Sequence, residues 1–483
     1  MKRSNMTIAA AVVGLFAAVP AYGQERTSFG IRQPAPVEQT RFNYDSYYAA
    51  EEGATQEQAP AAPAPAADPA YDSNHSSCPS NGCNGGCNGC CNGCDSACED
   101  ECGPWKLFDF GECSPWIISG FVDQGFTWNP DSPTDRFNAP LVFNDRANEY
   151  QLNQVYLYAE RTTNTDYNWF DVGGRVDLLY GTDWRFTPAA GLEVNQDGTD
   201  RWNVGQRFYG LAMPQLYAEF AVSDVKFKVG RWYTIAGYEV VPATGNFFYS
   251  HAMTHQYFEP FTHTGILGSW AMSDAVTFYG GIDRGWDQWE NNNAGDNPSF
   301  IGGVTLTGDI FTLAWAFTAG NEAALGSVPT TQSRYYNSWV LTTNVTENFK
   351  WVLEHDYGFQ DDAVSDGNGG VQDAEWYSVT NYFFYTINCK WAAGLRAEWS
   401  RDDDGFRVAT LGPPKGPGRG PGFAGNFYEV TCGLHYQANA NILFRPEVRW
   451  DWYDGEDGVG GRPFDDGTDS SLFTMGVDAI VTY

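Results

Sequence analysis

The sequence contains no uninterrupted apolar run of about twenty residues, the length that a helix needs to cross a bilayer. It also lacks any stripe rich in Lys or Arg. The whole chain has 28 basic and 60 acidic residues, and its net charge is -32. The motifs G-x-S-x-G, H-E-x-x-H and the P-loop are absent as well. These absences argue against a helical membrane protein, a nucleic-acid-binding protein and an enzyme built on one of those motifs. A barrel enzyme with scattered catalytic residues stays open as a minor alternative.

What the chain does contain is alternation, most clearly in residues 441–483. One set of alternate side chains in residues 442–452 is apolar and the other is charged, and the final segment repeats the pattern up to an aromatic C-terminal residue, Tyr483. The apolar sets are Ile442, Phe444, Pro446, Val448, Trp450 and Trp452, then Phe473, Met475, Val477, Ala479 and Val481. Successive strand side chains point to opposite faces, so lipid outside and water inside would explain both sets.

The same pattern recurs from residue 116 onward and predicts an all-β fold, an antiparallel transmembrane β-barrel of about sixteen strands. The strands are expected at 116–128, 150–161, 168–180, 209–222, 225–234, 261–272, 275–286, 299–307, 310–319, 335–345, 349–359, 374–386, 389–400, 426–437, 441–453 and 471–483. Seven short connections alternate with eight long ones, which is the outer-membrane arrangement of short periplasmic turns and longer outer loops. An aromatic content of 16% and 53 Gly fit strands, girdles and tight turns.

The N-terminal part of the chain reads as three segments before the barrel at 116–483. Residues 1–23 have Lys2 and Arg3, an apolar run and a small-x-small site, which is typical of a signal peptide. Residues 24–77 are rich in Ala and Pro and are expected to form a disordered periplasmic tether. Residues 78–115 form a Cys-rich segment with nine cysteines: Cys78, Cys83, Cys87, Cys90, Cys91, Cys94, Cys98, Cys102 and Cys113.

The spacing of these cysteines leaves two interpretations open. The pairs Cys87-x-x-Cys90 and Cys91-x-x-Cys94 have the spacing of zinc ligands, whereas an oxidising compartment favours disulfides. We favour disulfides. Because nine is odd, one thiol could bond to another component of the envelope.

Two groups of residues resemble a known family. The runs Ser119–Phe126 and Leu152–Leu157, and the stretch from Gly230 to Gly265, are similar to the putative β-barrel porin family described as OmpL-like. The resemblance covers residues 116–483 and implies an outer-membrane location and a porin-like role. It supplies no catalytic residues, and it does not extend to the tether or the Cys-rich segment.

The polar strand faces supply the candidate pore-lining residues. They are Arg175, Asp177, Glu219, Lys226, Lys228, Asp283, Glu354, Asp356, Arg396, Glu398, Arg445, Glu447, Arg449, Asp451 and Asp478, with Tyr156 and Glu160 beside them. Positive and negative side chains across a water-filled pore create a transverse electric field that selects solutes. Alternatively, neighbouring strands pair these charges into salt bridges that fill the interior.

The long connection at 235–260 differs from the acidic outer loops because it is apolar, with only Glu239 and Glu259 as charges. Such a loop is unlike one exposed to water, so we expect it to fold into the barrel and constrict the pore with Glu239, Glu259, Tyr238 and His251. His251, His255 and His263 could suggest a metal, but we interpret them as polar packing. No metal site, cofactor or catalytic residue is predicted.

The sequence thus predicts a porin that lets small hydrophilic solutes or ions diffuse passively, with a preference for cations. Its expected partners are the lipid bilayer and these solutes, with a homotrimer by analogy and no nucleic acid. The alternative is a structural or adhesive barrel, plugged by its own loops and anchored to the envelope through the Cys-rich segment.

Overall fold

The computed structural model describes residues 104–111, 114–196, 198–290, 298–322, 332–365, 370–408, 422–458 and 461–483. These residues all belong to one compact unit. The predicted signal peptide (1–23), the predicted tether (24–77) and all nine cysteines of the predicted Cys-rich segment lie outside the described residues.

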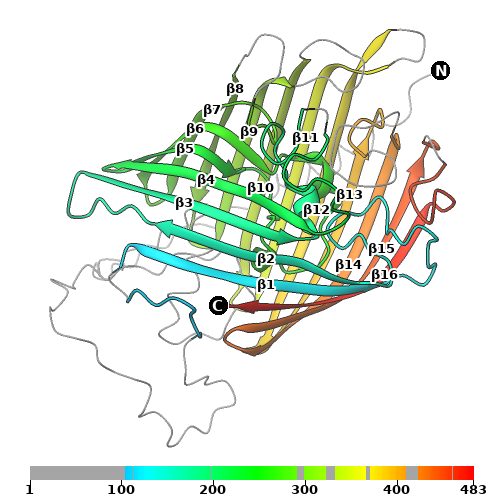
Figure 1. The fold of residues 1–483 in the computed structure, drawn as a ribbon, viewed down its shortest axis with the longest axis horizontal. Coiled ribbons are helices and arrows are strands. Elements are labelled where there is room, and N and C mark those ends of the chain that lie inside the picture. Colours follow the sequence, from blue (N-terminus) through cyan, green and yellow to red (C-terminus); the bar gives the residue numbers. More distant parts are fainter. Residues whose placement is uncertain are drawn as a thin grey trace, which may run out of the picture. The chain divides into compact units, whose positions relative to one another are not determined.

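Sixteen antiparallel strands form one closed barrel, in which each strand pairs with the next and β1 pairs with β16 (Figure 1). The strands are β1 (Trp116–Trp128), β2 (Tyr150–Arg161), β3 (Phe170–Gly181), β4 (Gly210–Val222), β5 (Val225–Tyr233), β6 (Thr262–Ser273), β7 (Val276–Asp283), β8 (Ser299–Thr307), β9 (Phe311–Glu322), β10 (Gln332–Thr346), β11 (Phe349–Ser365), β12 (Val371–Asn388), β13 (Trp391–Asp402), β14 (Gly425–Asn439), β15 (Ile442–Gly455) and β16 (Ser471–Thr482). The predicted fold class and strand number are confirmed.

The main differences from the predicted strands lie at β11 and β12. Residues 360–373 were expected to form a long acidic loop, but both strands continue into this region and Ser365 pairs with Val371. The register shifts between Gln360 and Val364, so Asp361 and Asp362 fall at an irregularity inside the ladder. Because Ala363 and Val364 pack against buried apolar residues, pairing resumes beyond the acidic pair.

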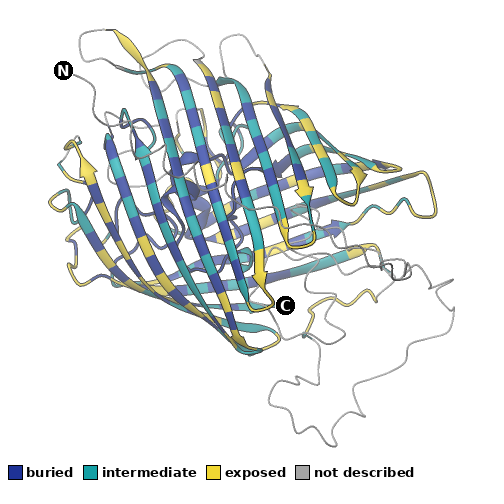
Figure 2. Ribbon diagram, turned by 180° about the vertical axis from the view of Figure 1, so that it is seen from behind, coloured by how far each residue is buried: buried dark blue, intermediate teal, exposed yellow. Residues whose placement is uncertain are grey.

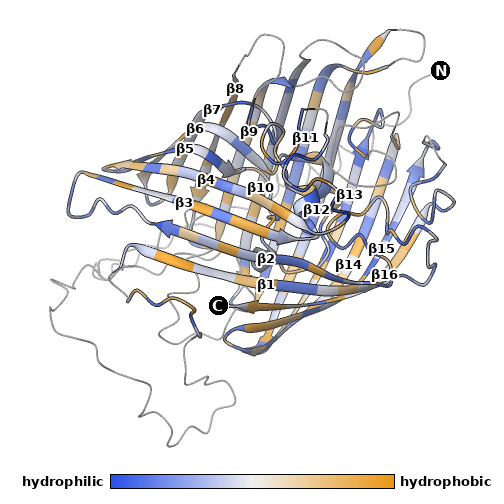
Figure 3. Cartoon of the chain, viewed as in Figure 1, coloured by the Kyte–Doolittle hydropathy of each residue, from blue (hydrophilic) through white to orange (hydrophobic). Residues whose placement is uncertain are grey.

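The two faces of the strands differ as the alternation predicts. In β15, Arg445, Glu447, Arg449 and Asp451 are buried, whereas the intervening Val448, Trp450 and Trp452 are exposed. Figures 2 and 3 show these stripes of burial and hydropathy along the strands. An apolar outer face around a polar interior is the arrangement of an outer-membrane barrel. Among the described residues, no helix is both long and apolar enough to cross a membrane.

The barrel closes where the two ends of its chain meet. In the seam between β1 and β16, Phe121 lies opposite Thr482 and Trp128 lies opposite Met475. Beyond the ladder, Tyr483 donates its backbone N–H to Gly120 O at 2.9 Å and accepts from Gly120 N at 3.1 Å. The Tyr483 hydroxyl also donates to the backbone oxygen of Tyr156 at 3.0 Å. The C-terminal aromatic residue is therefore part of the closure.

Three long connections pack against one another through buried side chains. We call them loop 1 (129–149), loop 2 (182–209) and loop 3 (234–261). The ring of Phe143 in loop 1 lies 5.1 Å from that of Phe186 in loop 2 and 4.4 Å from that of His251 in loop 3. Loop 1 also accepts a hydrogen bond from the Tyr257 hydroxyl at Pro140 O, and its Val142 N–H donates to Gln256. The three loops thus share one core.

Candidate site: an inward-folded loop held by charged wall residues

Loop 3 runs from the end of β5 to the start of β6 and contains two short helical turns, η3 (Ala243–Gly245) and η4 (Thr254–Phe258). Its two ends are joined by the hydrogen bond from Thr234 N to Phe261 O, 2.9 Å long. Asn246 fixes its middle, because the side chain accepts from Val240 N and donates to Val240 O and Pro242 O. Almost every residue of the loop is buried. The loop is therefore an ordered insert.

Acidic side chains of the strands accept hydrogen bonds from the backbone of loop 3. Glu354 of β11 accepts from Tyr238 N at 2.6 Å, and Glu447 of β15 accepts from Tyr249 N at 2.9 Å and from Ser250 N. Glu398 of β13 accepts from the amides of Met253 at 2.7 Å and Thr254 at 2.6 Å. An irregular buried backbone needs such partners for its N–H groups.

Arginine side chains of the same wall donate to the carbonyl groups of the loop. Arg445 Nη1 donates to Ala243 O at 2.8 Å and Asn246 O at 2.7 Å, and Arg396 donates to Ser250 O at 2.8 Å. Arg449 donates to the backbone oxygen of His251. Each arginine also pairs with an inward carboxylate, namely Asp478 for Arg445, Glu429 for Arg396 and Asp451 for Arg449. Because these guanidinium groups are buried, their carboxylate partners are required to offset the cost of desolvation.

The loop contacts reach half way around the barrel. Gln154 of β2 accepts from Ala243 N at 3.1 Å, and Ser338 of β10 accepts from Gly237 N at 3.2 Å. In the closed ring, β2 and β10 are separated by eight strand steps in either direction, so they lie opposite each other. Loop 3 is therefore inside the barrel and covers the half of its inner wall that runs from β2 through β16 to β10.

Glu239, which we expected at the constriction, is bound on several sides. Its carboxylate contacts Arg396 Nη1 at 2.7 Å and His251 Nδ1 at 2.9 Å, and it accepts from Ala252 N at 3.0 Å. Burial raises the pKa of Glu239, but Arg396 and His251 outweigh this and hold it well below its ordinary value. Burial lowers the pKa of His251, which Glu239 only partly offsets. The pair is therefore a glutamate anion beside a largely neutral imidazole.

Tyr238 and Glu259 lie in different surroundings. The ring of Tyr238 packs against Tyr382 at 4.6 Å between centroids, within an apolar cluster that includes Phe247 and Phe384. Glu259 lies 2.5 Å from His255 Nδ1 and beside Glu354 and Asp356. Gly237, at φ +84°, adjoins Glu259 so closely that a Cβ there would lie 1.8 Å from its Oε2.

The remaining candidate residues of the wall pair with their strand neighbours. Arg175 contacts Asp177 at 2.7 Å and Glu160 at 2.8 Å. Lys226 lies 3.5 Å from Glu219, Lys228 lies over the ring of Tyr217, and Asp283 contacts His263 at 3.0 Å. Glu354, Arg396, Glu398, Arg445, Glu447 and Arg449 thus gather around loop 3, whereas the candidates on β3–β7 form separate pairs.

Several anchoring residues were not among the predicted ones. Asn153 and Gln154 of β2 are adjacent in sequence yet both buried, because Asp123 pairs with Gln154 and Gln124 with Leu152, which leaves Asn153 in a bulge. Both amides donate to Asp183 of loop 2, and Gln154 also donates to Val241 O at 2.8 Å. Burial raises the pKa of Asp183 to about 7. The sequence signal that could have found these anchors is a pair of consecutive side-chain amides in a strand whose other residues alternate between polar and apolar.

His435 of β14 is a further anchor that the alternation did not single out. Its Nε2 lies 2.5 Å from Phe247 O, and its ring stacks on that of Phe247 with 3.8 Å between centroids. A single histidine on a polar strand face gives no indication of its partner.

A closed antiparallel barrel with an apolar outer face and an ordered loop inside defines a porin-type protein of the outer membrane. Residues 116–483 match the family described as "Putative beta-barrel porin-2, OmpL-like", and the chain belongs to this family. No curated protein matches the sequence.

Two solved structures are similar to this chain at low sequence identity. The anion-selective porin from Comamonas acidovorans is similar with a TM-score of 0.52 and 10% identity, over 76% of this chain and 99% of that one. The outer membrane channel DcaP of Acinetobacter baumannii has a TM-score of 0.49 and 11% identity, over 76% and 97% of the two chains.

Proposed function

We propose that the protein is a diffusion channel for small hydrophilic solutes or ions, and that loop 3 sets the width of its pore. The observation that carries this proposal is the attachment of loop 3 to inward side chains of the strands that run from β2 through β16 to β10. On the opposite part of the wall loop 2 binds Arg231 of β5, and we propose that solutes pass beside it, along β5 to β7. Inward residues there, such as Lys226, Lys228 and Thr277, are half-buried rather than buried.

The proposed channel prefers cations. The inward arginines Arg396, Arg445 and Arg449 are each neutralised by a carboxylate, so they contribute little free positive charge. Acidic residues, by contrast, outnumber basic ones by 60 to 28 over the whole chain. A surplus of carboxylates beside a narrow pore attracts cations and repels anions.

A structural or adhesive barrel is the second candidate, because the wall residues around loop 3 are almost inaccessible to water. Arg396 is 0% exposed, Glu354 2% and Glu447 6%. If the rest of the interior were equally filled, the barrel would be a plugged scaffold, anchored through the Cys-rich segment.

Planar-bilayer recording of the refolded full chain distinguishes the two functions. A channel gives discrete conductance steps, and a reversal potential in a salt gradient that favours cations. Replacing residues 238–258 with a short Gly-Ser linker should increase the conductance and the solute size limit. If the folded protein produced no conductance steps, the channel would be refuted. A reversal potential that favours anions would refute the cation preference alone.

We further propose that the chain is exported by residues 1–23, with its extension in the periplasm, and that barrels associate as homotrimers. The Cys-rich segment would then bind an envelope partner through a disulfide. A non-reducing gel of envelope extracts tests this bond, because a reductant-sensitive band above the monomer is expected, and a monomer alone would contradict it. Native mass measurement in detergent tests the trimer.

A further inference from the structure

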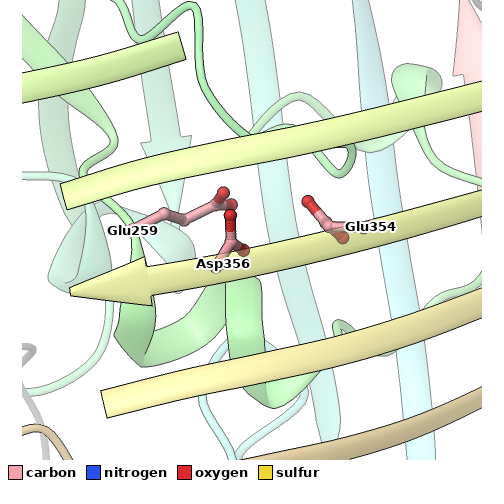
Figure 4. Close-up of side chains that lie close together, drawn as sticks. All are labelled: Glu259, Glu354 and Asp356. Atoms are coloured by element: carbon pink, nitrogen blue, oxygen red, sulfur yellow. The ribbon is translucent and has the colours of Figure 1, made fainter. Parts of the chain in front are cut away.

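Three carboxylates converge where loop 3 ends against β11. Glu354 and Asp356 are alternate residues of β11 and share its inner face, and Glu259 follows η4 in loop 3. One oxygen from each lies within 4.8 Å of the other two, and the residues are 2%, 0% and 1% exposed. Figure 4 shows the Glu259 carboxylate above Asp356. Glu354 lies farther along the strand that carries Asp356.

The two strand carboxylates of this cluster lack, among the described residues, the arginine partner that Asp177, Asp451 and Asp478 have. Within the described ranges, no Lys or Arg pairs with Glu354 or Asp356, whereas Glu259 contacts His255. Like charges this close in a buried place cannot all stay ionised unless a cation or shared protons compensate them.

Neighbouring groups hold the two strand carboxylates in place through hydrogen bonds. Tyr336 donates its hydroxyl to Asp356 Oδ1 at 3.1 Å, and Tyr382 donates to Glu354 Oε2 at 3.1 Å. Asp356 Oδ2, however, has no hydrogen-bond partner in the described part of the chain. Ser378, which lies directly opposite Asp356 on β12 and is 0% exposed, likewise has an unpartnered Oγ there. Directly paired strand residues project to the same face about 5 Å apart, so this hydroxyl borders the carboxylates.

We propose that Glu259, Glu354 and Asp356 bind a calcium ion, with Ser378 Oγ and water completing the shell. Calcium takes oxygen ligands at about 2.3–2.6 Å, so any two of its ligands lie at most roughly 4.6–5.2 Å apart. The three carboxylate oxygens, all within 4.8 Å of one another, are therefore close enough to share one ion. An all-oxygen set of three carboxylates suits calcium better than zinc. The ion clamps the end of loop 3 to β11. Binding does not depend on whether the barrel conducts.

Terbium luminescence tests the site, because Tb³⁺ replaces Ca²⁺ and is sensitised by nearby aromatic rings such as Tyr336. The refolded full chain, freed of metal with a chelator, is titrated with Tb³⁺ at pH 7.5 and then with Ca²⁺ as competitor. We expect saturable luminescence that Ca²⁺ removes. Since loss of even an outer-shell partner costs about 10–100-fold in metal affinity, Asp356→Asn should weaken binding by at least about tenfold.

The matched control is Asp177→Asn, an equally buried inward acid that Arg175 neutralises, and it should bind as the wild type does. Glu259→Gln serves as a second variant, since it changes the loop and leaves the strand intact. Far-UV circular dichroism and the gel shift on boiling confirm that each variant is folded. The absence of Ca²⁺-sensitive luminescence in the wild type, or equal Tb³⁺ affinity in folded Asp356→Asn, would overturn the site and favour shared protons.

Discussion

Replacing Glu398 with Gln should loosen loop 3 while leaving the strand intact. The Glu398 carboxylate accepts from Met253 N at 2.7 Å, from Thr254 N at 2.6 Å and from the Thr254 hydroxyl. Glutamine has the same shape, but only its side-chain oxygen can accept a hydrogen bond. Its NH₂ group must therefore face an amide that also donates.

The expected cost is that of one charge-assisted hydrogen bond, about 2–3 kcal/mol once the Thr254 hydroxyl has rotated to accept from the new NH₂ group. At 1.4 kcal/mol for each factor of ten, the docked state of the loop loses roughly 30–150-fold in its equilibrium. Hydrogen exchange at the amides of Met253 and Thr254 should accelerate by a similar factor, because exchange follows local opening.

Exchange is measured by mass spectrometry on the refolded protein, with single-channel recording in parallel to detect additional conductance steps. The control is Glu219→Gln, the same change at an inward acid of β4 whose partners are Thr163 and Lys226. If exchange at residues 249–254 were the same in Glu398→Gln and the wild type, the wall carboxylates would not hold the loop.

Two further predictions concern loop 2 and the seam. Burial raises the pKa of Asp183 to about 7, so the folded state binds the proton more tightly than the unfolded chain. The protonated form stabilises the fold below about pH 4, and up to about 4 kcal/mol is lost as the pH rises to 7. Denaturant unfolding of Asp183→Asn should lack this slope, and an unchanged slope would exclude Asp183 as its source. Deleting Tyr483 removes four hydrogen bonds, two with Gly120 and one each with Ser119 and Tyr156, and should lower the free energy of unfolding by about 2–3 kcal/mol, measured by urea titration in detergent. An unchanged midpoint would contradict its part in closure.

The barrel could be predicted from the sequence because its signal is local. Whether Arg449 and Asp451 face inward follows from the apolar residues beside them, Val448 and Trp450, and needs no knowledge of other strands. The alternation of short and long connections then fixes the strand order. What failed at residues 360–373 was the assumption that consecutive acids end a strand.

The contacts of loop 3 could not be predicted in the same way. Its apolar composition indicated that it folds inward, but Glu447 meets Ser250 across 197 positions of sequence, and Arg396 meets Glu239 across 157. An irregular backbone has no period that would select these partners. Glu239 was expected to face the permeant, and the structure instead places it against Arg396 and His251; its part in permeation stays a prediction.

The residues that anchor loop 3 come from strands far apart in the sequence, and this determines when the loop can dock during assembly. Gln154 comes from the second strand and Glu447 from the fifteenth, and both bind loop 3. They come into register only when the first and last strands have joined. The loop must therefore dock late in assembly, and a barrel whose seam has not formed would display an undocked loop with unpaired amides, a surface that a chaperone or protease could distinguish from the finished protein.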